Sequence, residues 1–306
     1  MSDFVDRISV DEKIQRKDMI EKDILLHHIL LDLSKEKFFA ENFLFKGGTC
    51  LIKHYLGYVR FSEDIDFTWK NQIRFAGKSG RQIDKEVSEI TETTGKILEK
   101  ISSGRGLDFK WDKGNRDYVE LVSRGKICTF KVWYNSDVSK ERMYIKIQIN
   151  FVDNLCLKPI DGNLKSLITG KHDKLGALYE EYAEYASTIP FGVYDVREIL
   201  SEKIRAILTR KGTKARDFLD VFLISKNLGV ETKDVEDCII KKIGYALEHY
   251  ERYRDNFEEK KNLLDKGSIF NWGIERGLLI TEIDDEELDR FLDDLINYLK
   301  ELVRKF

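Results

Sequence analysis

Several features that would restrict the class of protein are scarce in this chain of 306 residues. It has only two prolines, which is typical of ordered and helix-rich structure. No apolar run approaches the roughly 18 residues that a membrane-spanning helix needs, and the N-terminal segment, MSDFVDRISVDEK, has no hydrophobic signal region. The four cysteines are scattered and form no CxxC pair, which favours reduced thiols over a disulfide framework or a zinc site. These absences predict a cytoplasmic protein without a membrane partner.

An excess of charge of one sign is also lacking. The chain has 52 basic and 55 acidic residues and a net charge of −3. A charge so close to zero excludes a protein that coats nucleic acid non-specifically, although a local basic patch remains compatible with it. The length is sufficient to bury a substantial core, either in one large domain or in two small ones.

Hydrophobic periodicity predicts an α+β N-terminal half and a helical C-terminal half. Near the N-terminus we expect helices at 18–35, 49–56 and 81–101, and strands at 43–45, 61–69, 117–122, 126–135 and 142–151. Turns between the last three strands indicate an antiparallel run. Further helices are expected near 173–186, 196–210, 214–227, 232–248, 250–264 and 285–304. We therefore predict a domain of residues 1–160 with a mixed or antiparallel sheet, followed by a helical domain of residues 161–306.

A glycine pair lies between the first predicted strand and the next helix. Gly47 and Gly48 have no Cβ, so the backbone there can turn sharply and phosphate oxygens can approach its amides. Thr49 can cap the helix or donate a hydrogen bond to a phosphate. Taken alone, this short motif is better explained as an ordinary turn between a strand and a helix.

Two aspartates follow on the next predicted strand, in the segment FSEDIDF. Because strand side chains alternate, Ser62, Asp64 and Asp66 are expected on one face and the apolar residues between them on the other. Two neighbouring carboxylates repel each other unless a cation neutralises them. Mg²⁺ is coordinated by carboxylates and substrate phosphates in many proteins. Together with the glycine pair, this pattern favours a metal site at Asp64 and Asp66 over an edge of solvated acids.

A polar row on a later strand is a further candidate. Lys146, Gln148 and Asn150 share one face of the predicted strand 142–151, opposite a row of isoleucines. If this strand lies beside the two aspartates, the row borders the metal site. A solvent-facing row fits the sequence equally well.

The helical half contains one dense cationic segment. Its basic residues are Lys203, Arg205, Arg210, Lys211, Lys214 and Arg216. Such cations can neutralise a triphosphate or hold an RNA backbone. Asp217 is a candidate for metal binding or for orienting Lys203 or Arg216. By itself the segment is better explained as a solvated basic helix, and Arg216 with Asp220 as a helical ion pair.

Tyrosines are a weaker signal. Tyr179, Tyr182, Tyr185 and Tyr194 could stack on nucleic-acid bases. A packing stripe explains their spacing better.

Several short blocks together resemble the nucleotidyltransferase toxins of the AbiEii/AbiGii family, which includes MenT-type toxins. In chain order they are residues 21–23 (EKD), 45–49 (FKGGT), 60–67 (RFSEDIDF), 198–203 (EILSEK) and 216–220 (RDFLD). The resemblance implies a minimal nucleotidyltransferase core of the DNA polymerase β superfamily. It also implies transfer of a nucleotide from a nucleoside triphosphate to an acceptor, which is tRNA in related toxins, and restraint by a partner antitoxin.

Roles for individual residues follow from this resemblance. Asp64 and Asp66 are expected to bind Mg²⁺ or Mn²⁺. Gly47, Gly48, Thr49 and Ser62 would hold the triphosphate, with Lys203 and Arg216 on its phosphates. Asp217 would act as an additional acid. Lys203 and Asp217 would thus reach the reaction from the helical domain.

One departure from the family's superfamily leaves alternatives open. Enzymes of the polymerase β type usually have a third carboxylate on the strand beside the two aspartates, where this chain offers Gln148 and Asn150. A non-catalytic protein that binds nucleotide or RNA on the same fold is therefore one alternative. An enzyme that transfers the nucleotide to a protein hydroxyl is another.

Overall fold

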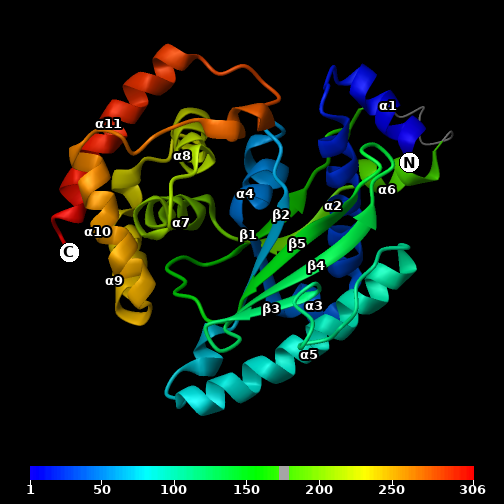
Figure 1. The fold of residues 1–306 in the computed structure, drawn as a ribbon, viewed down its shortest axis with the longest axis horizontal. Helices are drawn as coiled ribbons and strands as arrows, with labels where there is room; N and C mark the ends of the chain where they lie inside the picture. Colours follow the sequence, from blue (N-terminus) through cyan, green and yellow to red (C-terminus); the bar gives the residue numbers. More distant parts are fainter. Residues whose placement is uncertain (172–178) are drawn as a thin grey trace. The chain divides into compact units, whose positions relative to one another are not determined.

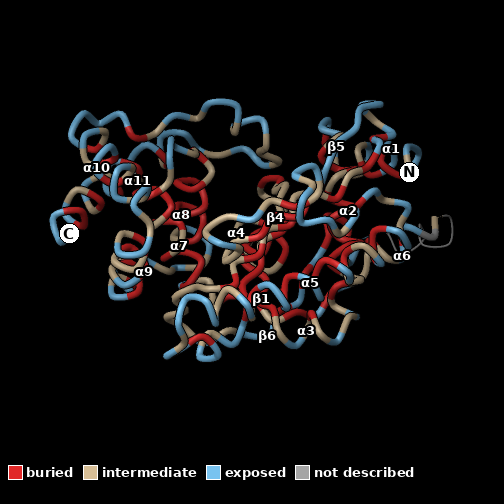
Figure 2. The backbone as a smooth tube through the Cα atoms, turned by 60° about the horizontal axis from the view of Figure 1, so that its bottom comes forward, coloured by how far each residue is buried: buried red, intermediate tan, exposed pale blue. Residues whose placement is uncertain are grey.

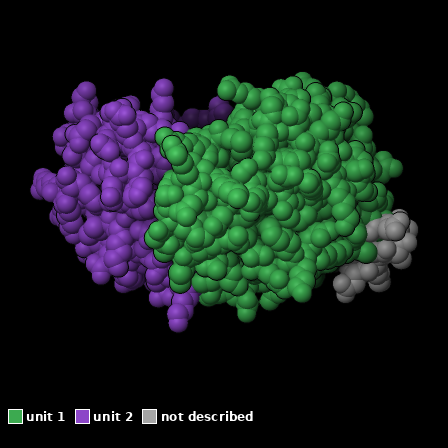
Figure 3. All heavy atoms as spheres, turned by 90° about the horizontal axis from the view of Figure 1, so that it is seen from below, with its two compact units in different colours: residues 1–153, 159–194 green, residues 154–158, 195–306 purple. Residues whose placement is uncertain are grey.

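The computed structural model describes residues 1–171 and 179–306, which form two compact units. Unit 1 consists of residues 1–153 and 159–194, and unit 2 of residues 154–158 and 195–306; Figure 3 colours them separately. The predicted helix 173–186 lies partly outside the described residues, and its described part is α6 (Glu180–Ala186). Within the described residues, no helix is long and apolar enough to cross a bilayer.

Seven strands of the described residues form one mixed sheet in unit 1, visible in Figure 1. Their order across the sheet is β3 (Val119–Val122), β4 (Ile127–Asn135), β5 (Arg142–Asn150), β2 (Asp64–Trp69), β1 (Phe43–Lys46), β7 (Ile189–Val193) and β6 (Ile160–Leu164). The predicted antiparallel run is confirmed, because β4 pairs antiparallel with both β3 and β5. Strand β2 lies between β5, to which it is parallel, and β1, to which it is antiparallel. The two aspartates therefore stand near the middle of the sheet.

The helices of unit 1 are α1 (Ser2–Asp11), α2 (Lys17–Lys35), α3 (Lys37–Asn42), α4 (Gly47–Cys50), α5 (Gly80–Gly104) and α6, and a π-helical turn, Leu51–Leu56, continues α4. The long helix α5 begins with a capping box between Ser79 and Gln82, which satisfies backbone donors at its first turn. Buried positions follow β1 and α2 in Figure 2. Rings of Phe39, Phe43 and Phe67 meet within this core, at centroid distances of 4.3 to 6.4 Å. Such packing holds β1 and β2 rigidly.

Unit 2 is helical, as predicted for the C-terminal half. Its α-helices are α7 (Val196–Thr209), α8 (Ala215–Leu228), α9 (Glu236–His249), α10 (Glu251–Asp265) and α11 (Asp285–Val303). Asp284 caps α11 by accepting hydrogen bonds from the amides of Glu286 and Glu287. One side of α11 is apolar and buried, and its buried leucines are Leu288, Leu292, Leu295, Leu299 and Leu302.

The α+β class with a helical C-terminal half is confirmed, and the local differences have physical reasons. Strands β6 and β7 were not predicted, because both are short and carry Gly162, Pro190 or Gly192, which favour turns. They pair with the sheet, so residues 159–194 pack with unit 1. The compact units divide after residue 153 and after residue 194. The predicted division at residue 160 into a catalytic domain and a supporting domain remains a prediction.

Candidate active site

Asp64 and Asp66 lie on the same face of β2. The residues between and after them, Ile65 and Phe67, are fully buried on the other face. In the register of the sheet, Asp66 stands opposite Lys46 on β1 and Gln148 on β5. The carboxylates are partly exposed, as metal ligands that meet a substrate need to be. The predicted shared face of Asp64 and Asp66 is confirmed, whereas Ser62 precedes the strand, because β2 begins at Asp64.

The polar row of β5 does border the aspartates. Asp64 is opposite Lys146, and the Lys146 Nζ lies 3.7 Å from the Asp64 carboxylate. Gln148 is the direct neighbour of Asp66, and Asn150 follows opposite Thr68. The expectation that β5 supplies no carboxylate at this place therefore agrees with the register.

The glycine turn comes into direct contact with the aspartates. Gly47 has φ of +77°, and a Cβ built there would lie 2.5 Å from Asp66 Oδ2. A Cβ on Gly48 would lie 2.7 Å from the Arg60 guanidinium and 3.3 Å from Ser62 Oγ. A Cβ at either position would therefore displace a neighbouring side chain, and the positive φ of Gly47 also favours glycine there. The structure brings together the two halves of the motif that the sequence could only associate by spacing.

The Thr49 side chain connects the glycine turn to the segment that precedes β2. Its hydroxyl lies 2.8 Å from Ser62 Oγ and donates to the carbonyl of Asp64. Thr49 is buried, with 1% of its surface exposed. Its side chain therefore fixes the segment that leads into β2. The residues of this first group, all in unit 1, are Gly47, Gly48, Thr49, Ser62, Asp64 and Asp66.

Sequence reasoning missed Asp153, which lies just beyond the end of β5. Its Oδ2 atom accepts hydrogen bonds from Lys46 Nζ at 3.0 Å, Tyr194 OH at 3.0 Å and Thr68 Oγ1 at 3.3 Å. Lys46 and Asp153 are each about one-tenth exposed. Since Lys46 stands opposite Asp66, this buried ion pair, which has no net charge, lies beside the aspartates on the neighbouring strand. Only the path of the chain after β5 reveals it.

An aromatic and cationic strip was also missed. Trp133 on β4 is opposite Tyr144 on β5, with ring centroids 4.9 Å apart. The Arg142 guanidinium lies 4.5 Å from the centre of the Trp133 ring, and Lys131 Nζ lies 5.9 Å from that of Tyr144. We call Lys131, Trp133, Arg142, Tyr144 and Lys146 the outer strip. Because strand side chains alternate, the outer strip lies on the same sheet face as Asp64. Lys146 stands opposite Asp64, and the other members of the strip continue from Lys146 along β5 and β4.

The second predicted group lies in unit 2. Lys203 Nζ on α7 is 2.8 Å from Asp217 Oδ1 and 2.6 Å from Asp220 Oδ2, both on α8. Arg210 reaches the other oxygen of Asp217 at 2.6 Å. Burial would raise the pKa of Asp217, but Lys203 and Arg210 outweigh it and hold that pKa well below its usual value. Lys203 and Asp217 are thus joined, as one of the sequence-based alternatives had it.

Arg216 lies at the start of α8 and makes a different contact. Its guanidinium is 3.4 Å from Glu275, whose other oxygen accepts from the Arg216 amide at 2.9 Å. The tyrosines fit the packing explanation, because Tyr182, Tyr185 and Tyr194 are buried. The roles predicted for Lys203, Arg216 and Asp217 in the reaction remain predictions.

A family model matches residues 28–301 and is described as "Nucleotidyl transferase AbiEii toxin, Type IV TA system". The chain belongs to this family. The resemblance found in the sequence is thereby confirmed, and the protein is an enzyme of the nucleotidyltransferase class, a toxin of a toxin–antitoxin system. No curated protein matches the chain.

Three solved structures are similar to this chain. MenT4, the nucleotidyltransferase toxin Rv2826c from Mycobacterium tuberculosis, is 16% identical with a TM-score of 0.50, over 95% of this chain and 98% of that one. JHP933 from Helicobacter pylori is 16% identical with a TM-score of 0.46, over 94% of each chain. A putative nucleotidyltransferase from H. pylori is 18% identical with a TM-score of 0.44, over 92% of this chain and 94% of that one. The likeness to MenT4 supports the fold alone.

Proposed function

We propose that this AbiEii-family toxin transfers a nucleoside monophosphate from a nucleoside triphosphate to the 3′ end of an RNA, with tRNA as the expected acceptor. The observation that carries the proposal is the close approach of the Gly47–Gly48 turn to the partly exposed Asp66. A triphosphate can approach backbone amides closely where the residues are glycines. Its metal ions need carboxylate ligands at the same place.

The residues fit a divalent metal. Asp64 and Asp66 offer hard oxygen donors on one face of a strand, and both are partly exposed. We assign them as ligands of Mg²⁺, or of Mn²⁺, in the working enzyme. When bound, such an ion neutralises phosphate charge and aligns the reacting oxygens. Lys46 stands opposite Asp66 and is paired with Asp153, so the negative charge of Asp153 is balanced beside this site.

The chain's own groups then bind and orient the reactants. The Gly47 and Gly48 backbone and Ser62 would hold the triphosphate, with Thr49 fixing the segment beneath it. Lys203, held between Asp217 and Asp220, would serve the phosphates, and Arg216 would assist. The domain assignment of residues 1–160 to nucleotide transfer and of 161–306 to these supporting groups belongs to the same proposal.

The reaction is an in-line substitution at phosphorus. The oxygen of an acceptor hydroxyl bonds to the α-phosphorus and loses its proton, while the bond between the α-phosphorus and the bridging oxygen breaks. Pyrophosphate leaves with that oxygen. Positioning and charge neutralisation supply most of the acceleration in reactions of this kind.

The outer strip favours RNA over a protein hydroxyl as acceptor. Trp133, flanked by Arg142 and Tyr144, is the kind of surface on which an unpaired base stacks. Tyr144 precedes Lys146 by two residues and Gln148 by four on β5, and these two residues stand opposite Asp64 and Asp66. Two residues along a strand span about 6.6 Å. An RNA end lying along β5 would bring its 3′ hydroxyl to Asp64 and Asp66.

The alternative of a non-catalytic binding protein rested on the lack of an acid on β5 beside Asp66, and membership of the nucleotidyltransferase family argues against it. Incubation of the purified protein with Mg²⁺, each labelled nucleoside triphosphate and total tRNA or total protein separates the candidates. Label in tRNA supports the proposal, and label in protein supports transfer to a protein hydroxyl. Metal-dependent binding of the triphosphate without transfer to either pool supports the binding protein.

The same assay tests the proposed metal ligands. Asp64→Ala and Asp66→Ala are expected to lower transfer at least 1,000-fold, roughly the order that loss of a central charge-stabilising group gives. Circular dichroism should show an unchanged fold, because both carboxylates are partly exposed. Transfer by Asp64→Ala at the wild-type rate would exclude this site.

An antitoxin is expected as the partner of a toxin of this family. Co-expression tests it: the antitoxin is the protein, encoded next to the toxin, that suppresses its toxicity.

A further inference from the structure

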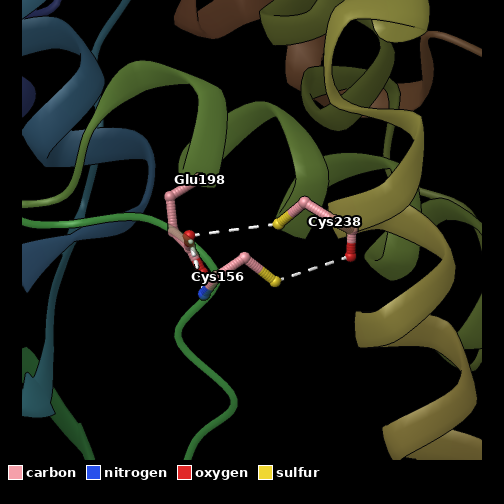
Figure 4. A group of neighbouring side chains, drawn as sticks. All are labelled: Cys156, Glu198 and Cys238. Carbon is pink, nitrogen blue, oxygen red and sulfur yellow. Dashed lines mark hydrogen bonds between the residues drawn. The ribbon is translucent and has the colours of Figure 1, made fainter.

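Two of the four cysteines, far apart in the sequence, meet in unit 2. Cys156 lies in the irregular segment Asn154–Lys158, and Cys238 lies in the first turn of α9. Their sulfur atoms and a carboxylate oxygen of Glu198, on α7, all lie within 4.8 Å of one another. Figure 4 shows the three side chains pointing toward a common centre.

The carboxylate of Glu198 is already used. Its oxygens accept hydrogen bonds from the amides of Cys156 and Leu157, and Lys242 Nζ lies 2.6 Å from Oε1. Lys242 and Glu198 are both about 2% exposed, so this ion pair is shielded from water. A metal ion at this centre would need the carboxylate lone pairs and would meet the ammonium group. The arrangement therefore fits a pair of thiols better than a metal site.

The two thiols differ in character. The Cys156 thiol donates to the Cys238 carbonyl at 3.8 Å, and the Cys238 thiol donates to Glu198 at 3.9 Å. The neighbouring Cys238 thiol, and after it the charge of Lys242, lowers the pKa of the Cys156 thiol. The hydrogen bond to Cys156 and burial raise the pKa of Cys238. Cys156 is also half-buried, whereas Cys238 is buried. Cys156 thus combines a lowered pKa with access to small oxidants, and the sulfur of a second thiol lies within 4.8 Å.

We infer that Cys156 and Cys238 are a redox site, in which Cys156 reacts with a hydroperoxide and Cys238 then closes a reversible disulfide. In the first step the Cys156 thiolate attacks one peroxide oxygen, the O–O bond breaks, and Cys156 becomes a sulfenic acid while the other oxygen leaves as an alcohol or water after protonation. In the second step the Cys238 sulfur attacks the Cys156 sulfur, and water leaves with the Cys238 proton.

Closing the bond is compatible with the local structure. The sulfurs must approach from within 4.8 Å to about 2.05 Å. Cys156 lies outside helices and strands, so its segment can make that movement without breaking a regular element. The disulfide would fasten segment 154–158 to α9, across 82 residues of sequence. That segment directly follows Asp153, so oxidation restrains the chain next to the pair of Lys46 and Asp153.

The chain provides its own controls in Cys50 and Cys128. Both are fully buried, and burial raises the pKa of each thiol. The purified full-length protein is treated with hydrogen peroxide in steps, alkylated and digested. The expected result is a peptide that joins Cys156 to Cys238, lighter by two hydrogen atoms and restored by dithiothreitol, while Cys50 and Cys128 remain alkylated. In Cys238→Ser, Cys156 should accumulate as a sulfenic acid that dimedone captures.

Three results would overturn the inference. The first is oxidation of Cys156 to sulfinic acid in the wild-type protein without any joined peptide. The second is oxidation of Cys50 or Cys128 at the same peroxide concentration. The third is protection of both Cys156 and Cys238 by one equivalent of Zn²⁺ at neutral pH, which would make the cluster a metal site. The readout is chemical, so it does not depend on nucleotide transfer.

Discussion

Gly47 lies against the carboxylate of Asp66, so closely that an added Cβ would be 2.5 Å from Oδ2. The strand that ends before the glycine and the strand that carries the aspartate are antiparallel neighbours, with Lys46 opposite Asp66. In the proposed site, this one backbone turn would therefore determine how close a triphosphate comes to the carboxylates. The absence of a side chain at position 47 serves both the turn and the site.

This relationship predicts that Gly47→Ala loses far more activity than its backbone strain explains. The new methyl group would displace the Asp66 carboxylate, and we expect kcat/KM for the triphosphate to fall by about 100-fold or more, in line with the loss of precise positioning. Gly57→Ala is the matched control, because Gly57 has φ of +75° and its Cβ would meet nothing within 4 Å.

Both variants should lose a similar stability, about 1–3 kcal/mol for a non-glycine residue at positive φ. Urea denaturation measures that loss, and labelled-nucleotide transfer measures activity. Equal activities of the two variants would show that contact with Asp66 is not needed for the reaction.

The outer strip predicts a separate effect on the acceptor. Trp133→Ala or Tyr144→Ala should raise KM for the RNA about 10-fold, because stacking of one base contributes on the order of 1–3 kcal/mol. Binding of the triphosphate should stay unchanged, since the groups proposed to hold it are the glycine turn and Ser62 and not the outer strip. Metal-dependent binding of the triphosphate and transfer to RNA are measured on the same preparations.

Met143→Ala is the control for the strip. Met143 is next to Tyr144 but lies on the opposite face of β5, and it is 37% exposed. It should leave KM for RNA unchanged. If both ring variants behave like Met143→Ala, the acceptor takes another route to the aspartates.

The sequence predicted the elements whose side-chain pattern is repeated over several residues. Alternation in the segment DIDF placed Asp64 and Asp66 on one face, and the polar row of β5 was visible in the same way. Their meeting needed the pairing of β2 with β5, which no local pattern contains. The sequence did not predict strands β6 and β7, because both are short and contain glycine or proline, which favour turns.

Other site residues depend on contacts between distant segments. Asp153 shows its importance only when the chain after β5 brings it to Lys46, 107 residues away. Trp133 and Tyr144 become a pair only through the register of β4 with β5. The ion pair of Lys203 with Asp217 could be listed as one alternative, because α7 and α8 are joined by a short connection. The packing of those helices decides it.

The pair of Lys46 and Asp153 predicts strong coupling. Asp153→Asn should destabilise the protein by about 3 kcal/mol, because it leaves a nearly buried ammonium without its carboxylate. Lys46→Met should cost a similar amount. The double variant should lose clearly less than the sum of the two, and denaturation of the four proteins measures the coupling. Simple additivity would show that the two side chains stabilise the fold independently.

The cluster around Lys203 predicts a stability difference that depends on pH. Lys203 and Arg210 hold the pKa of Asp217 well below its usual value of 3.8. A carboxylate with a lowered pKa contributes stability that is fully present above the pKa of the unfolded chain and is lost as pH falls toward the folded pKa. At pH 7, Asp217→Asn should therefore cost about 3–5 kcal/mol, the range for breaking a buried ion pair. Below pH 3.8 the cost should decline steadily.

Urea denaturation of the wild type and of Asp217→Asn from pH 7 to pH 2.5 measures this difference. Asp293→Asn is the control, since Asp293 is an exposed acid on α11 in the same unit. Its cost should be close to zero at every pH, because an exposed carboxylate contributes little. If the stability difference between the wild type and Asp217→Asn stayed constant down to pH 2.5, the loss would come from the packing of the amide and not from the lost charge. The ion pair of Asp217 with Lys203 would then not be the source of the stability.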